Sequence, residues 1–198
     1  AGSTLGEMLD YKGALDVSGL PVADLTGLNL MTGITSLNIA NTQVSDLTPL
    51  AGLSALESLD ASNIQMTSLD AGMLPESLSY IDISDNTKLT AIEKDALAGL
   101  AQITEIYLTD SPALETLYLN DAKIAYFNIT GCTSLTEINA EGAEIDTVDL
   151  GNNTYVEKLI LNDATVGELR LSGYTSLAEL YATGIDLNEI DLTGCTGL

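Results

Sequence analysis

The feature that most constrains this chain is a short triplet that recurs at an almost constant spacing. Each triplet holds an apolar, a variable and an apolar residue, as in Leu37-Asn38-Ile39. Alternation of this kind indicates a strand with one buried face, and its repetition along a chain is typical of a solenoid. Nine triplets begin at Leu15, Leu37, Leu59, Ile81, Ile106, Phe127, Val148, Leu169 and Ile190, with spacings of 22, 22, 22, 25, 21, 21, 21 and 21 residues.

The residue two positions after each triplet supports this register. Glycine, asparagine and aspartate tolerate a positive φ or form local side-chain turns. We therefore expect the chain to turn sharply as it leaves every strand. The nine residues at this position are Gly19, Asn41, Asn63, Asp85, Asp110, Gly131, Asn152, Gly173 and Gly194.

The segments that return from one strand to the next differ between the two halves of the chain. In the first half, spaced leucines with a proline, as in residues 44–50, suit a 3₁₀ or irregular turn. Residues 92–100 are long enough for a short helix. In the second half the return contains a further triplet, which predicts a second parallel sheet facing the first across a thin core. Its four strands are Leu117-Tyr118-Leu119, Ile138-Asn139-Ala140, Leu159-Ile160-Leu161 and Leu180-Tyr181-Ala182.

Two parts of the chain resemble known bacterial leucine-rich repeats. Residues 15–58 resemble the 22-residue repeats of the internalin family of surface proteins, and residues 44–50 match the outer turn of that family. Residues 106–198 resemble the 21-residue repeats called the IRREKO type, with nested halves of 10 and 11 residues. The resemblance implies a leucine-rich repeat solenoid with a parallel sheet on its concave face. It also implies a secreted or surface-anchored bacterial protein that binds a partner on that sheet.

The repeats define the expected domain organisation. We expect a helical cap over residues 1–14 and one leucine-rich repeat domain over residues 15–198, with longer repeats in 15–105 and 21-residue repeats in 106–198. The sequence ends inside a repeat, so we expect the natural protein to continue. A capping box at Thr4-Leu5-Gly6-Glu7 and one apolar helical face predict that the cap covers the first layer of the solenoid, with Leu5, Met8 and Leu9 on that face.

The composition restricts the functions that such a solenoid can have. Six lysines and arginines stand against 29 aspartates and glutamates, and the resulting net charge of −23 repels nucleic acids and anionic membranes. The chain has no histidine, which removes the usual acid–base group and the common catalytic triads. It contains no calcium-loop motif. We therefore expect a monomer that is not an enzyme, holds no metal or cofactor, and does not insert into membranes.

The two cysteines occupy equivalent places three repeats apart. Cys132 and Cys195 fall in the Asn/Cys position of the repeat, with Asn153 and Tyr174 at the intervening places. Adjacent strands lie about 4.8 Å apart, so the two sulfur atoms are separated by roughly 14 Å. A disulfide needs Cα atoms within about 7 Å. The spacing therefore predicts two buried free thiols.

A group of tyrosines marks the candidate binding residues. The outward residues of three adjacent strands place Tyr80, Glu105 and Tyr126 in one row, and Asp82, Tyr107 and Asn128 in a second row about 6.6 Å away. Asp149 and Arg170 on the following strands form the rim. Elsewhere the same columns hold mostly small polar and acidic residues, so the cluster is local. Phe127 belongs to the inward column and is expected in the core.

Two functions are compatible with this pattern. In the first, the chain is a protein- or glycan-binding module of an exported bacterial surface protein. The tyrosines then form the hot spot, and the carboxylates pair with a basic patch on a protein or with sugar hydroxyls. In the second, the solenoid is a spacer that presents another domain, and tyrosine simply suits an exposed strand.

Overall fold

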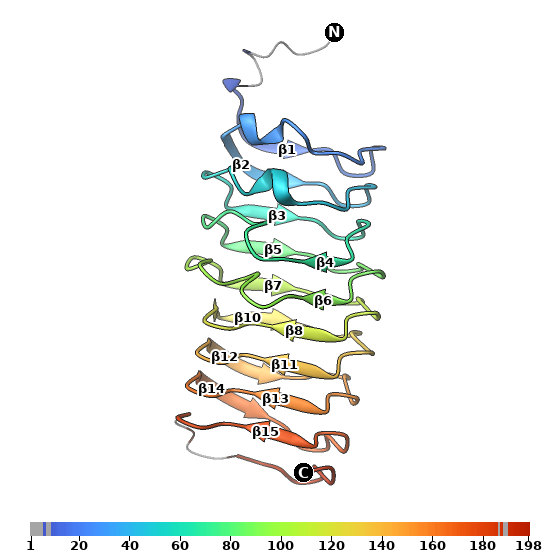
Figure 1. The fold of residues 1–198 in the computed structure, drawn as a ribbon, viewed down its shortest axis with the longest axis vertical. Coiled ribbons are helices and arrows are strands. Elements are labelled where there is room, and N and C mark those ends of the chain that lie inside the picture. Colours follow the sequence, from blue (N-terminus) through green and yellow to red (C-terminus); the bar gives the residue numbers. More distant parts are fainter. Residues whose placement is uncertain (1–5, 7–8, 186, 188–189) are drawn as a thin grey trace.

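The computed structural model describes residues 6, 9–185, 187 and 190–198. The chain winds through a stack of short strands into an elongated solenoid with its first and last strands at opposite ends (Figure 1). The leucine-rich repeat fold predicted from the triplets is confirmed. Most of the predicted N-terminal cap, including Thr4, Leu5, Glu7 and Met8, lies outside the described residues. Among the described helices, none has the length and apolar character needed to cross a bilayer.

The predicted primary sheet forms over the first six strands. These strands pair in parallel, each with the next turn of the chain, so each inward leucine or isoleucine lies beside its equivalent one repeat later. The strands are β1 (Lys12–Asp16), β2 (Gly33–Asn38), β3 (Ser58–Asp60), β5 (Tyr80–Asp82), β7 (Glu105–Tyr107) and β10 (Tyr126–Asn128).

Strands or a bridge form at the nine triplets, but the ladder between them is interrupted after β10. β12 (Glu144–Asp149) pairs with β9 (Lys123–Ile124) and β14 (Thr165–Arg170) in a separate three-stranded sheet. Only an isolated bridge joins Arg170 to Asp191 in the last turn. The first two residues of β12 pair with a segment that precedes β10, and no ladder between β10 and β12 is described.

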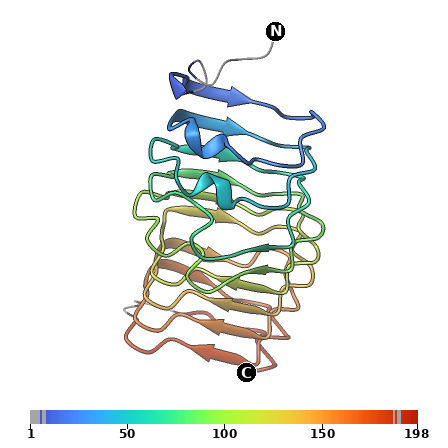
Figure 2. The same ribbon diagram turned by 45° about the horizontal axis from the view of Figure 1, so that its top comes forward.

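The second sheet is more extensive than the four strands predicted. Two strands from the first half of the chain join it, so this sheet spans six turns of the stack without interruption. It runs along the side of the solenoid opposite the primary sheet (Figure 2). Its members are β4 (Ser68–Leu69), β6 (Ala91–Ile92), β8 (Thr116–Tyr118), β11 (Glu137–Asn139), β13 (Lys158–Ile160) and β15 (Glu179–Tyr181).

The returns in the first half agree only in part with the sequence pattern. Two 3₁₀ helices, η1 (Leu28–Leu30) and η2 (Thr48–Leu50), form at the expected places. The short helix expected over residues 92–100 does not form. Ala91–Ile92 is a strand, and Asp95 and Gly99 have φ values of 65° and 84°. Residues in this left-handed region cannot continue a right-handed helix.

The turns that end the primary strands follow the predicted residues closely. Every predicted turn residue except Asn152 has a positive φ, between 49° and 88°. After β12 the left-handed residue is instead Gly151, with a φ of 59°, one position earlier. Asn152 uses its side-chain Oδ1 to accept a hydrogen bond from the backbone N–H of Gly131 at 3.0 Å. The turn is therefore altered at the point where the primary ladder is interrupted.

A single apolar core fills the space between the two sheets along the stack. Phe127 is 7% exposed and lies in this core, as its place in the inward column predicts. Cys132 is buried and Cys195 half-buried, and both thiols are free. The prediction of free thiols is confirmed, whereas complete burial of Cys195 is wrong, because Cys195 lies in the last described turn with no further turn over it.

Candidate binding surface

Strand register brings the predicted binding residues together on the outer face of the primary sheet. Glu105 on β7 pairs with Tyr80 on β5 and with Tyr126 on β10. Tyr107 pairs in the same way with Asp82 and with Asn128. The two rows of the candidate site therefore lie on three adjacent strands. We call Tyr80, Tyr107 and Tyr126, with Asp82 and Glu105, the aromatic face.

The three tyrosine rings of the aromatic face contact one another. The ring centroids of Tyr80 and Tyr107 lie 5.6 Å apart with an interplanar angle of 41°. Those of Tyr107 and Tyr126 lie 5.7 Å apart at 54°. Tilted pairs at such distances stabilise one another by about 0.5–1.5 kcal/mol beyond their burial. Tyr107 therefore holds the two outer rings in a fixed arrangement.

The rings remain accessible although they pack together. The Tyr126 residue is 49% exposed, while Tyr80 and Tyr107 are half-buried. Glu105 is exposed and Asp82 is half-buried beside them. The face thus offers accessible aromatic area next to carboxylates on the surface of the protein.

The local charges keep the phenols neutral. Partial burial raises the pKa of Tyr80, and the carboxylate of Asp82 raises it further. The pKa of Tyr107 is raised chiefly because its hydroxyl donates a hydrogen bond to Oε2 of Glu105 at 3.2 Å. Both effects oppose formation of a phenolate. At physiological pH the face therefore presents neutral rings in a negative potential.

The middle outward residue of the primary strands has a structural role that sequence reasoning missed. At seven of the nine positions an Asp or Asn side chain accepts a hydrogen bond from the backbone N–H two residues later, at 2.8–3.1 Å. This local bond closes the turn that follows the strand. The recurrence of Asp or Asn in the middle of the triplet was the available signal. We call these positions the Asx column: Asp16, Asn38, Asp60, Asp82, Asn128, Asp149 and Asp191 form the bond.

Tyr107 and Arg170 are the two members of the Asx column that lack a side chain able to form this bond. Asp82, Asn128 and Asp149 were predicted as ligand contacts, yet each already holds a turn. Tyr107 and Arg170 instead direct their side chains to neighbouring strands, since Tyr107 contacts two other rings and Arg170 contacts two carboxylates. The column therefore departs from its structural role at these two places.

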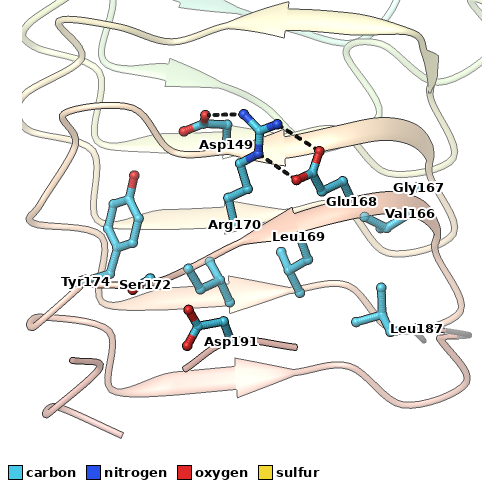
Figure 3. A pocket seen from close by; sticks show the side chains of 11 residues that line it. Asp149, Val166, Gly167, Glu168, Leu169, Arg170, Ser172, Tyr174, Leu187 and Asp191 are labelled. Carbon is cyan, nitrogen blue, oxygen red and sulfur yellow. Dashed lines mark hydrogen bonds and ion pairs between the residues drawn. The ribbon is translucent and has the colours of Figure 1, made fainter. Parts of the chain in front are cut away.

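Arg170 forms the rim of the site through an ion-pair network (Figure 3). Its Nε and Nη2 donate to the two carboxylate oxygens of Glu168 at 2.8 Å each, and Nη1 lies 3.5 Å from Oδ2 of Asp149. The hydrogen bonds from Arg170 lower the pKa of Glu168. All three side chains are about half exposed, so these pairs orient the guanidinium more than they stabilise the fold. The network borders a hollow of about 790 Å³ beside β14.

A second hollow, of about 340 Å³, lies where the primary ladder is interrupted. Tyr126 and Asn128 line it from β10, and Asp149 lines it from β12. The side chain of Arg170 reaches it from β14. This hollow could not be foreseen, because the repeat pattern predicts uniform pairing. We call it the β10–β12 hollow.

The described residues offer little for catalysis or metal binding. Among them, no group of three or more histidine, cysteine, aspartate or glutamate residues lies close enough to hold a metal ion. Burial raises the pKa of the Cys132 thiol to about 11. Because the thiolate and not the thiol is the nucleophile, Cys132 is unreactive as a nucleophile at neutral pH.

The stacked parallel strands and the triplet pattern define a leucine-rich repeat solenoid fold. Residues 1–86 match the family model for the leucine-rich repeat domain of the endo-β-N-acetylglucosaminidase EndoS. This match confirms the leucine-rich repeat prediction for the first part of the chain. No curated protein matches the chain.

Solved structures with a similar course of the chain include two internalins of Listeria monocytogenes. The internalin InlF is 20% identical with a TM-score of 0.45, over 98% of this chain and 60% of that one. This chain therefore spans less than two thirds of InlF. Internalin C2 is 20% identical with a TM-score of 0.45, over 97% of this chain and 81% of its own. Human 5T4 is 16% identical with a TM-score of 0.42, over 93% and 80%.

Proposed function

We propose that this chain is a non-catalytic binding module of an exported bacterial surface protein, and that it binds a basic segment of a partner protein on the aromatic face. The observation that carries this proposal is the contact of Tyr80, Tyr107 and Tyr126 on the outer surface of the primary sheet. Tyrosine rings of this kind are enriched at the centres of protein interfaces.

The charge around the rings favours a cationic group on the partner. A lysine or arginine side chain over a tyrosine ring gains about 0.5–2 kcal/mol, depending on how far the pair is desolvated. Asp82 and Glu105 stand next to the rings and supply carboxylates for the same cation. The net charge of −23 accelerates the approach of a basic partner and repels an acidic one.

The turn-forming role of the Asx column supports a spacer as the second candidate. At seven of its nine positions the side chain closes a turn of the solenoid. The outer face at these positions is polar and has no distinctive feature. A spacer does not account for Tyr107, however. This residue replaces a turn-forming side chain and contacts two further rings. The aromatic face therefore favours the binding module.

The test compares lysine-rich peptides with versions in which glutamine replaces lysine, together with an array of glycans, as probes of the immobilised protein. The binding variant carries Tyr80, Tyr107 and Tyr126 to Ala. The control variant carries Tyr118, Tyr155 and Tyr181 to Ala, and so loses as many rings elsewhere. We expect the binding variant to weaken lysine-peptide binding by at least about tenfold and the control variant to leave it unchanged.

Three results would contradict the proposal. Unchanged binding in both triple variants would show that the overall negative charge, and not the aromatic face, captures the peptide. Capture of glycans alone, lost in the binding variant, would replace the protein partner by a carbohydrate. Failure of every probe to bind would favour the spacer. Urea unfolding of each variant shows whether the fold is retained.

A further inference from the structure

The interruption of the primary ladder leaves a backbone group without its usual partner. In five successive layers the last residue of the triplet donates its N–H to a carbonyl on the next strand at 2.8–2.9 Å, as Ala61 does to Asp82 and Leu108 does to Asn128. The equivalent bonds from Ile129 to Asp149 and from Leu150 to Arg170 are absent from the described hydrogen bonds. Ile129 also lines the β10–β12 hollow. A main-chain donor is thus available at this hollow.

The side chains around the β10–β12 hollow offer both donors and acceptors. Asn128 uses Oδ1 to close its turn, and its Nδ2 has no partner among the described contacts. Asp149 uses Oδ1 in the same way, and its Oδ2 lies 3.5 Å from Nη1 of Arg170. Thr130 adds a hydroxyl to the lining. Polar groups of both kinds therefore converge on one space.

The charges in the β10–β12 hollow disfavour an ionic ligand. Arg170 is already bound by both oxygens of Glu168 and lies beside Asp149, so little positive charge remains for an anion. The same guanidinium lies next to Asp149 and weakens the attraction of that carboxylate for a cation. A neutral molecule with several hydroxyl groups can accept and donate hydrogen bonds here without an uncompensated charge.

The size of the hollow and the position of Tyr126 further restrict the class of ligand that can bind there. A volume of about 340 Å³ is at the lower end of the range of small-molecule sites, roughly 300–1,000 Å³. Tyr126 is the most exposed ring of the aromatic face and lines this hollow, whereas Tyr80 does not. An exposed ring next to fixed polar groups can cover the apolar face of a sugar while the polar groups bind its hydroxyls.

We propose that the β10–β12 hollow binds one neutral sugar unit of a glycan. Tyr126 packs against the sugar ring, and Asn128 Nδ2, the Ile129 N–H and Asp149 bind its hydroxyls. The site lies where no ladder joins β10 to β12 and where the turn after β12 is altered at Gly151, although β9 and β12 keep the 21-residue register. It shares Tyr126 with the basic-segment site, which is centred on Tyr107, but it does not require that a basic segment binds there.

The test uses neutral tetrasaccharides of glucose, mannose and N-acetylglucosamine as probes, with binding followed by saturation-transfer NMR. We expect at least one of them to bind and Tyr126→Ala to weaken it by about tenfold or more. Tyr126→Phe keeps the ring and should bind like the wild type. Tyr80→Ala removes a ring of the same row outside the hollow and should also leave sugar binding unchanged.

A second variant, which blocks the hollow, distinguishes loss of sugar binding from loss of stability in Tyr126→Ala. Thr147→Tyr adds a bulky ring to the β12 side of the hollow without removing any of the proposed sugar contacts, and it should abolish sugar binding. Binding that survives Thr147→Tyr, or that Tyr80→Ala weakens as much as Tyr126→Ala, overturns the proposal. So does the failure of all three sugars to bind below about 10 mM. Lysine-peptide binding by Thr147→Tyr should persist, which separates this proposal from the preceding one.

Discussion

Asn86 joins two layers of the solenoid, and its replacement by alanine should destabilise the protein strongly. The side chain is fully buried. Its Nδ2 donates to the carbonyl of Ile83 at 2.7 Å and to that of Ala61, one layer earlier, at 3.0 Å. Its Oδ1 accepts from the N–H of Ile64 at 2.9 Å. Ile64 occupies the same slot one layer earlier and has no polar side chain, so Asn86 serves both layers.

The expected loss follows from these three bonds. Each contributes about 1 kcal/mol net, and a buried group left without a partner costs about 1–3 kcal/mol. Asn86→Ala should therefore lower the free energy of unfolding by about 3–5 kcal/mol. Urea unfolding followed by circular dichroism measures the change, and its slope shows whether the layers still unfold together.

Asn153 provides the matched control in the same slot. It is buried like Asn86, but it donates only to the carbonyls of Ile129 and Leu150, and its Oδ1 has no partner. Asn153→Ala should therefore cost about 2–3 kcal/mol, less than Asn86→Ala. An equal or larger loss for Asn153→Ala would refute the reasoning, because the difference would then not follow the number of bonds.

Three further predictions concern single sites. Gly142→Ala brings a Cβ into Oδ1 of Asp121 at a φ of 69°, so its urea midpoint should fall, with a loss of about 1–3 kcal/mol. A thiol reagent should label half-buried Cys195 before buried Cys132, as peptide mass mapping will show, and the reverse order would contradict the burial. The raised pKa of Tyr107 gives stability that is present below about pH 10 and lost above it, so Tyr107→Phe should unfold with a weaker alkaline dependence.

The sequence predicted the primary sheet well because its signal is strictly local. An inward apolar residue on either side of one outward residue, followed by a left-handed turn residue, determines the strand and its end. The second sheet was underestimated for the same reason. Around β4 and β6 the buried column continues as Leu69 and Ile92. Leu69 begins an apolar triplet that lacks the turn residue two positions later, and Ile92 begins no triplet. Pairing with β8 extends a sheet that the local pattern does not mark.

Part of the candidate site follows from local sequence patterns, and part depends on contacts between segments far apart in the sequence. The register of Tyr80, Tyr107 and Tyr126 followed from the triplets, because each strand is one repeat from the next. The β10–β12 hollow depends on the missing ladder between β10 and β12 and on the choice of Gly151 over Asn152 for the turn. Both residue types tolerate a left-handed backbone, so the sequence alone does not decide between them.

The departures from the repeat gather in one region of the primary face. Tyr107 lies on β7, the strand before β10, and Arg170 lies on β14, the strand after β12. Each replaces a side chain that closes its own turn elsewhere, at a cost of about 1 kcal/mol. Between them the ladder is interrupted and a hollow opens. A solenoid gains stability from uniform layers, and here β7 and β14 give up a turn bond while β10 and β12 give up the ladder between them. This concentration of departures is the reason for proposing that the region binds a partner.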